Sequence, residues 1–304
     1  MADGNSSDLI WYFGYGSMVN PTSLRRRGVV PVRSLPVRLP GFDLRFEMGW
    51  GMANITEDAA SEMHGVAHLV TQKMFDVLAH IESVYTYTLV HCLPYDPAAP
   101  PITARAFIVP PAEIEAQQTH LQAKGVASQL PSERYIRIIV EGLEHYGAAP
   151  AWIERIRTQR CNPTRPRRDW LRIPPAAPGA GRMTLAELEQ HQGKLPAVYA
   201  IGRKVVRADM GEGHPFAPIA KVLSGTQACV GMVMNLYEPL LPPVEGPGDL
   251  QPVHVEWAED QAVETAERFD FPLAHIAYLG ADEGDAGDGG SGGSGGSSHA
   301  LAAV

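Results

Sequence analysis

The chain has 304 residues, of which 45% are hydrophobic and 19% charged, a composition typical of one large globular domain or two modest ones. Its 34 acidic residues outnumber its 25 lysines and arginines, and the net charge of -9 argues against general binding to nucleic acid. No apolar run approaches the roughly 18 residues of a membrane span, and residues 1–8 resemble neither a secretory signal nor a transit peptide. The three widely spaced cysteines, Cys92, Cys161 and Cys229, predict free thiols in a reducing compartment, so we expect a cytoplasmic protein.

The first part of the chain, residues 9–175, is expected to form one domain rich in strands. An apolar run over residues 9–13 predicts a short buried strand that ends in the glycine-rich turn 14–17. Many strands with few helices between them favour an α+β fold, a small mixed β-barrel with flanking helices, over a doubly wound sheet. Further strands are predicted within 37–39, 42–46, 64–70, 87–92 and 103–109, and helices over 71–83, 113–124, 132–146 and 152–160.

A C-terminal α+β extension is expected over residues 183–280. Thr184 and Glu187 form a capping-box pattern that predicts a helix, and Gly202-Arg203 predicts a hairpin turn. The order of these segments with His214 faintly resembles the cytochrome b5-like fold, but no second axial histidine lies between Pro215 and Pro252, so no haem is expected. The other predicted elements are helices over 216–223 and 261–268 and a buried strand over 229–236.

Residues 281–304 consist mainly of Gly, Ser, Asp and Ala and include a repeated Gly-Gly-Ser pattern. Such a segment buries almost no apolar area, which predicts a disordered tail. The composition alone fits a natural tail and an engineered linker equally well.

Glu82 is the first candidate for chemistry. On the predicted helix over 71–83, Phe75, Leu78 and Ile81 mark the face toward the core, and Glu82 falls on the same face. Burial beside apolar side chains would raise its pKa and suit it to proton transfer near neutral pH. The pattern also fits a glutamate at the helix end whose side chain turns to water.

Five segments in chain order resemble the γ-glutamylcyclotransferase family. The first holds the turn Gly14-Tyr15-Gly16-Ser17, the fourth leads to a helix that ends in Glu82, and the fifth contains Tyr135. Met18 stands where the family motif has an asparagine, for which Asn20 is a possible replacement. The resembling segments are residues 12–17, 37–42, 51–55, 62–66 with the helix that follows, and 131–135.

The resemblance implies an enzyme, a lyase of the acyltransferase type, that cyclises a γ-glutamyl amide to 5-oxoproline and releases the amine or amino acid. It implies Glu82 as the catalytic acid and base, no metal or cofactor, and a small γ-glutamyl molecule as the partner. A glutathione-specific or γ-glutamylamine-specific relative and a non-catalytic binding module on the same fold remain open, as does the oligomeric state. The substrate-binding residues it implies are Tyr12, Phe13, Gly14, Tyr15, Gly16, Ser17 and Tyr135.

Other polar clusters have a structural interpretation. The spacing of the histidines between His64 and His91 matches no metal motif, which favours packing roles. The basic run from Arg155 to Arg172 is expected to form an ion-paired, solvated surface in this acidic protein. Tyr85 is expected to be a strand or turn residue.

Overall fold

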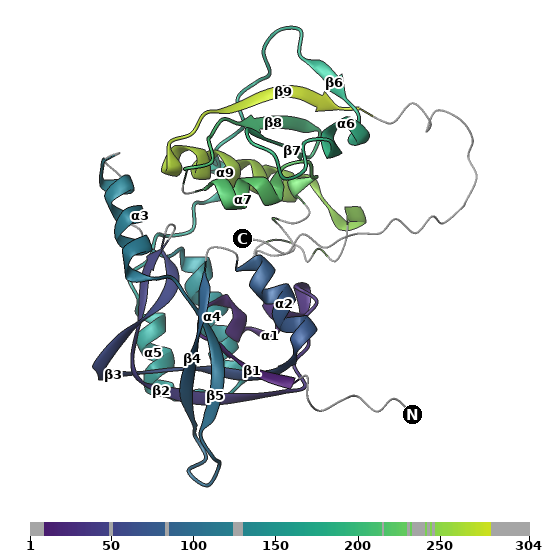
Figure 1. Cartoon of the computed structure of the whole chain (residues 1–304). Helices are drawn as coiled ribbons and strands as arrows, with labels where there is room; N and C mark the ends of the chain where they lie inside the picture. The colour runs from purple at the N-terminus through teal and green to yellow at the C-terminus, as the bar shows by residue number, and fades with distance from the viewer. Residues whose placement is uncertain are drawn as a thin grey trace, which may run out of the picture. The chain divides into compact units, whose positions relative to one another are not determined.

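The computed structural model describes residues 9–48, 51–82, 85–123, 130–214, 216–229 and 247–280, together with Met232, Leu241 and Val244. It divides into two compact units, which meet in the sequence between Thr164 and Arg165 (Figure 1). The predicted tail, residues 281–304, lies outside the described residues. None of the helices described is long and apolar enough to cross a membrane.

The first unit is built around a closed barrel with the strand order β1-β3-β2-β4-β5. All pairings are antiparallel except that of β5 with β1, which is parallel and brings Arg105 opposite Tyr12. The barrel closes without the exposed edges that an open sheet would have. Its strands are β1 Leu9–Gly14, β2 Arg33–Met48, β3 Met52–Thr71, β4 Thr86–Pro94 and β5 Ile102–Ile108.

The barrel confirms the mixed α+β fold predicted for this part of the chain, and its strands are longer than the patterns indicated. The two strands predicted within 37–39 and 42–46 are one strand, β2, whose register against β3 shifts between Pro40 and Phe42. Gly41 has a φ of 80° at this shift, a left-handed conformation that glycine adopts without a steric penalty. The irregularity interrupts the alternation of apolar residues without ending the strand.

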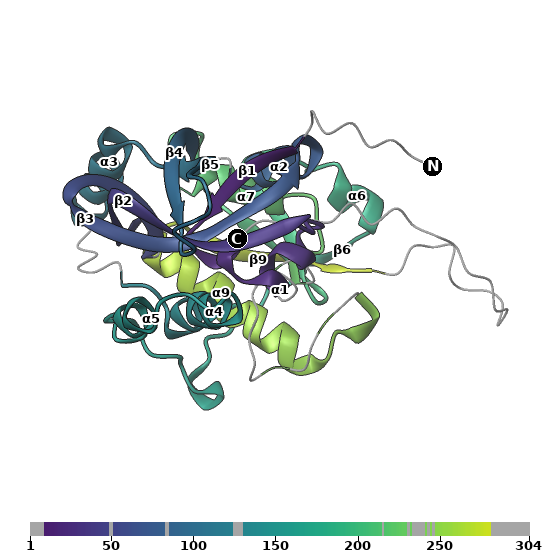
Figure 2. The same ribbon diagram turned by 90° about the horizontal axis from the view of Figure 1, so that it is seen from below.

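Helices α4 Glu133–His145 and α5 Pro150–Arg157 lie side by side against the barrel (Figures 1 and 2). Ser132 caps α4 by accepting a hydrogen bond from the backbone N–H of Tyr135, at 3.1 Å. The apolar side of α4, with Ile139 and Leu143 almost fully buried, packs into the same core as Phe13 of β1. The other helices of the first unit are η2 Ser17–Val19, α1 Pro21–Arg26, α2 Gln72–Ile81 and α3 Pro111–Ala123.

The second unit contains a four-stranded sheet of order β6-β9-β8-β7, in which β6 and β9 are parallel and the other pairs antiparallel. The predicted capping box of Thr184 and Glu187 and the hairpin at Gly202 are both present. The helix predicted over 261–268 is the second half of a much longer helix, α9. The elements are η3 Arg167–Asp169, β6 Gly181–Met183, α6 Leu185–Glu189, β7 Ala197–Ile201, β8 Lys204–Ala208, α7 Ala217–Leu223, η4 Pro247–Asp249, α9 Pro252–Phe269 and β9 Leu273–Leu279.

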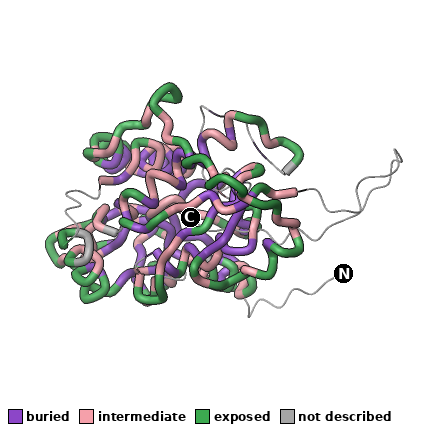
Figure 3. Tube along the Cα trace, turned by 90° about the horizontal axis from the view of Figure 1, so that it is seen from above, coloured by how far each residue is buried: buried purple, intermediate pink, exposed green. Residues whose placement is uncertain are grey.

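The segment predicted as a strand over 229–236 falls largely outside the described residues. Its first residue, Cys229, is helical, so the prediction is wrong at that position. All three cysteines are free thiols, with Cys92 and Cys229 buried and Cys161 partly so. Figure 3 shows how buried, intermediate and exposed stretches alternate along the backbone.

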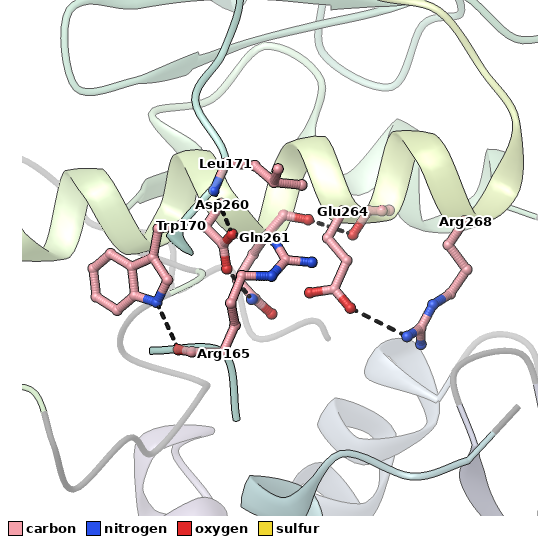
Figure 4. A network of polar contacts seen from close by, with 8 residues as sticks. Arg165, Trp170, Leu171, Asp260, Gln261, Glu264 and Arg268 are labelled. Atoms are coloured by element: carbon pink, nitrogen blue, oxygen red, sulfur yellow. Dashed lines mark hydrogen bonds and ion pairs between the residues drawn. The ribbon is translucent and has the colours of Figure 1, made fainter. Parts of the chain in front are cut away.

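The sequence pattern ends the first domain at residue 175, whereas the structure divides the two units between Thr164 and Arg165. The difference arises because the segment after Thr164 is held by α9. Arg165 donates to the buried carboxylate of Asp260 at 2.5 Å, and the backbone N–H of Leu171 donates to the same carboxylate at 2.8 Å (Figure 4). Glu256, one turn earlier on α9, pairs with Arg167 at 2.8 Å and Arg172 at 3.2 Å. The arginine-rich segment thus forms ion pairs with the helix, as the acidic composition indicated.

Candidate active site

Glu82 lies directly after α2, as its C-cap, with its backbone N–H donating to the carbonyl of Leu78 at 2.8 Å. Thr71 caps the start of the helix by accepting from the N–H of Met74. Phe75 and Leu78 are buried, as their spacing predicts, and they anchor the helix so that its last turn is fixed in place. The carbonyl of Glu82 then accepts from the N–H of Tyr85, which turns the chain toward β4.

Glu82 lines one pocket together with three residues of the glycine-rich loop, Tyr15, Gly16 and Ser17. The pocket contains one carboxylate and the side chains of four tyrosines, three of which were predicted to bind substrate. The lining residues are Tyr12, Tyr15, Gly16, Ser17, Met18, Met52, Ala53, Glu82, Tyr85, Phe107 and Tyr135.

The loop and Tyr135 are in close contact, although they are far apart in the sequence. A Cβ atom on Gly16 would lie only 2.7 Å from the Tyr135 hydroxyl, so this approach requires glycine. The same hydroxyl accepts from the backbone N–H of Ala53 at 3.3 Å and also interacts with the backbone of Ser17. Tyr135 therefore lies between the loop and the first residues of β3, with its ring packed edge-on against Phe46.

Two predicted substrate-binding residues, Phe13 and Gly14, do not line the pocket. Side chains alternate along a strand, and Phe13 points into the barrel core, where it is fully buried. Gly14 lies where β1 approaches β3, and its carbonyl oxygen would be 2.5 Å from a Cβ atom on Gly65. Both residues lie in the barrel behind the loop.

Asn20 does not replace the missing motif asparagine at position 18. Its side-chain oxygen caps α1 by accepting from the N–H of Thr22 at 2.9 Å, and its amide donates to the carbonyl of Ile138 at 3.1 Å. Asn20 is almost fully buried between α1 and α4. Met18 lines the pocket itself, so this wall of the site is apolar where the family motif has an amide.

Tyr85 and Arg27 were not identified as site residues from the sequence. Tyr85 lines the pocket and donates its hydroxyl hydrogen to the carbonyl of Ala53 at 3.2 Å. Arg27 is buried at the end of α1 and interacts electrostatically with Glu82. The position of Tyr85, three residues after Glu82, could have indicated that it lies near the site. Nothing in the run Arg25-Arg26-Arg27 distinguishes Arg27, which is buried, from the other two.

Burial is the largest influence on the pKa values of Glu82 and Tyr135 in the pocket. Burial raises the pKa of the Glu82 carboxyl above its usual value, and the positive charge of Arg27 partly offsets that rise. Burial likewise raises the pKa of the Tyr135 hydroxyl to about 12. The tyrosines are therefore neutral hydrogen-bonding groups near pH 7, and Glu82 is the lining residue suited to exchange a proton.

The other candidate groups lie outside the pocket. His68 is fully buried, with its Nδ1 atom 2.8 Å from the Ser34 hydroxyl. His64 contacts the Tyr95 hydroxyl and stacks on Trp152, which is a packing role. Among the residues described, no group of His, Cys, Asp or Glu side chains is arranged to hold a metal ion.

No protein-family model matches the chain, and no curated protein matches it either. Thirteen chains of solved structures match it. An uncharacterised human protein and a γ-glutamyl cyclotransferase have TM-scores of 0.41 at 20% and 19% identity, each over 51% of this chain and 90% of the other. YkqA from Bacillus subtilis has a TM-score of 0.39 at 19% identity, over 51% of this chain and 56% of its own. The likeness to these structures is one of fold and extends over about half of this chain.

Proposed function

We propose that the protein is a γ-glutamylcyclotransferase, which converts a γ-glutamyl amide to 5-oxoproline and releases the amine or amino acid. The observation that carries the proposal is the convergence of Glu82, the Gly16-Ser17 turn and the Tyr135 hydroxyl on one pocket. These groups come from three separate segments that the sequence singled out for this activity.

The reaction needs little beyond positioning and proton transfer. The α-amine of the substrate attacks its own γ-carbonyl carbon, a new C–N bond closes the five-membered ring, and the C–N bond to the leaving amine breaks. Holding the bent conformer makes this attack intramolecular and therefore fast. Starting from the α-ammonium form, the attacking nitrogen loses two protons as it becomes the lactam N–H. The departing nitrogen gains two as it leaves as an ammonium group, so the balance requires no further reactant.

In this proposal Glu82 relays these protons. As a carboxylate it accepts the proton from the α-ammonium group, and as the carboxylic acid it returns a proton to the leaving amine. Its raised pKa brings the two forms closer in free energy near neutral pH. Backbone N–H groups of the Gly16-Ser17 turn supply donors for an anionic group of the substrate or for the developing oxyanion.

The activity is tested by assaying 5-oxoproline release from γ-glutamyl amino acids, glutathione and γ-glutamylamines. Glu82→Gln keeps the shape of the side chain but removes its ability to transfer a proton. We expect it to lower kcat by roughly 10²–10⁴-fold with KM little changed. Glu62→Gln, on the exposed face of β3, is the matched control. Release of 5-oxoproline by the Glu82 variant at the wild-type rate would exclude this mechanism.

A non-catalytic binding module is the alternative on the same fold. It predicts that wild-type protein binds a γ-glutamyl compound without releasing 5-oxoproline. Calorimetric titration combined with product analysis separates the two functions. The relative rates on the three classes of substrate decide whether the enzyme is specific for glutathione or for γ-glutamylamines.

A further inference from the structure

Two tyrosine hydroxyls of the pocket are bound to the backbone of the same residue, Ala53. Ala53 lies at the start of β3, opposite Phe46 of β2, and its own side chain lines the pocket. Its carbonyl oxygen accepts a hydrogen bond from the Tyr85 hydroxyl at 3.2 Å. Its N–H donates to the Tyr135 hydroxyl at 3.3 Å. One peptide segment thus holds two pocket hydroxyls that come from distant parts of the chain.

The Ala53 backbone decides which role each hydroxyl plays. A hydroxyl has one hydrogen to donate and two lone pairs that accept, whereas a carbonyl oxygen only accepts and an N–H only donates. Tyr85 gives its hydrogen to the Ala53 carbonyl, so its remaining capacity is to accept. Tyr135 accepts from Ala53, and a second backbone hydrogen bond, to Ser17, acts to lower the pKa of this hydroxyl, which is the effect of an N–H donor. Tyr135 therefore keeps its hydrogen for a further acceptor.

The start of β3 is fixed from the other side as well. Asn54, the residue after Ala53, is fully buried and exchanges two hydrogen bonds with the backbone of Val109. Its amide donates to the Val109 carbonyl at 3.3 Å, and its side-chain oxygen accepts from the Val109 N–H at 3.0 Å. Tyr85 packs against the cluster that contains Val109. The Ala53 peptide groups are thus held in place relative to Tyr85.

Both hydroxyls keep their hydrogens near pH 7. Burial raises the pKa of Tyr85 well above its usual value, and it raises the pKa of Tyr135 to about 12. The Tyr15 hydroxyl donates to the carbonyl of Phe107 at 2.5 Å and has the same polarity as Tyr85, but Tyr15 is buried whereas Tyr85 is partly exposed. Tyr85 is therefore a neutral acceptor that a ligand in the pocket can reach.

We propose that Tyr85 is a substrate-binding residue that accepts a hydrogen bond from the α-ammonium group of the γ-glutamyl unit, while Tyr135 donates to one of its oxygen atoms. The inference rests on the proposed function, which supplies the γ-glutamyl substrate. An ammonium group only donates, and carboxylate and carbonyl oxygens only accept, so the two tyrosines fit the substrate in one direction. With one N–H bound to Tyr85 and another to Glu82, the α-nitrogen is oriented before it loses a proton.

The binding test uses calorimetry with the Glu82→Gln chain, from which the proposed proton transfer is removed. The two probes are γ-glutamylethylamide and N-ethylglutaramate, which is the same molecule without the α-amino group. Tyr85→Phe should weaken binding of γ-glutamylethylamide by roughly 10–100-fold, since hydrogen bonds to charged groups are the strong ones, and leave that of N-ethylglutaramate unchanged. Tyr135→Phe should weaken both probes by a similar, several-fold factor, because both contain the carboxylate and the amide carbonyl.

Tyr87→Phe is the matched control, because Tyr87 lies two residues further along β4, is 53% exposed and does not line the pocket. It should change neither affinity. Equal losses for the two probes in Tyr85→Phe would assign Tyr85 a structural role and overturn the proposal, as would an unchanged affinity for γ-glutamylethylamide. If neither the wild-type protein nor the Glu82→Gln chain binds either probe, the proposed function itself fails and this inference falls with it.

A crystal structure of the Glu82→Gln chain with bound γ-glutamylethylamide tests the same polarity with both tyrosines in place, so it does not depend on the folding of a tyrosine variant. We expect the α-nitrogen within hydrogen-bond distance of the Tyr85 oxygen, and a carboxylate or carbonyl oxygen of the ligand within hydrogen-bond distance of the Tyr135 oxygen. A ligand bound in the reverse direction, with its α-nitrogen at Tyr135, would overturn the proposal.

Discussion

Tyr135 is the residue at which a packing role and a binding role are most easily separated. Its ring is packed edge-on against Phe46, while its hydroxyl lies between the Gly16 turn and the N–H of Ala53. The ring would be needed in either role. The hydroxyl faces the pocket, so its removal changes the site more than the core.

We expect Tyr135→Phe to lower kcat/KM several-fold, because loss of one hydrogen bond to a bound molecule costs about 0.5–1.5 kcal/mol. The melting temperature should change little. Tyr95→Phe is the matched control, since the Tyr95 hydroxyl contacts His64 and accepts from Ala149 N–H away from the pocket. Steady-state kinetics with both variants check the prediction, and equal losses in the two would remove Tyr135 from the substrate site.

His68 makes the stability of the first unit depend on pH. The ring is fully buried between Tyr12 and Tyr146, and burial lowers its pKa from 6.5 to about 4, although the backbone of Met18 favours the protonated form. Because the pKa is depressed in the folded state, the contribution to stability is complete above pH ~6.5 and is lost as the pH falls toward 4. At roughly 1.4 kcal/mol per unit, the loss amounts to about 3 kcal/mol.

Urea unfolding between pH 7 and pH 4 measures this loss. His68→Leu removes the titrating group and leaves the Ser34 hydroxyl without its partner, so it should be less stable at pH 7 and should depend less on pH. A variant with the same pH dependence as wild type would show that other groups control acid unfolding.

At the scale of elements, the site depends on how closely α4 approaches the loop that follows β1. A Cβ atom on Gly142 would lie 2.7 Å from backbone atoms of Val19 and Asn20, so the absence of a side chain allows the contact. Asn20 strengthens it by donating to the carbonyl of Ile138. Since α4 also carries Tyr135, this contact fixes the distance between Tyr135 and the turn.

Gly142→Ala should have two opposing effects on stability, one from helix propensity and one from packing. Alanine would favour the helix by about 1 kcal/mol. The neighbouring atoms belong to backbone and cannot move aside, and overpacking of this kind typically costs 1–3 kcal/mol. We expect net destabilisation together with a raised KM, measured by thermal unfolding and kinetics. A more stable and fully active variant would show that α4 can move away from the loop without loss.

The sequence predicts most of the elements of the barrel unit and some of the residues that line its pocket. The spacing of Phe75 and Leu78 predicts a helix face toward the core, and both residues are buried, but the spacing alone leaves the direction of the Glu82 side chain open. Phe13 lies in the barrel core and not in the pocket lining, because side chains alternate along β1. Contacts between distant segments, such as that of the Tyr135 hydroxyl with the backbone N–H of Ala53, depend on packing that a local pattern does not contain.

At the scale of the whole molecule, each unit has hydrophobic clusters of its own. The pocket is lined by residues between Tyr12 and Tyr135, all within the first unit. In the second unit, Leu188, Val198 and Val205 form a separate hydrophobic cluster. Arg165 and Lys204 form ion pairs with α9 within the same unit. A unit with its own core can fold independently, and domain boundaries fall where few contacts cross.

We therefore expect a chain ending at Thr164 to fold cooperatively and to retain kcat/KM within a few-fold of the full-length value. The truncation removes none of the pocket residues, and Thr164 still donates its N–H to the Glu133 carboxylate at the start of α4. Ending the chain at Gly280, which removes only residues 281–304, is the matched control and should leave both melting temperature and activity unchanged. Circular dichroism and kinetics of the two truncations decide the outcome. Loss of activity in the folded shorter chain alone would show that the second unit contributes to the site.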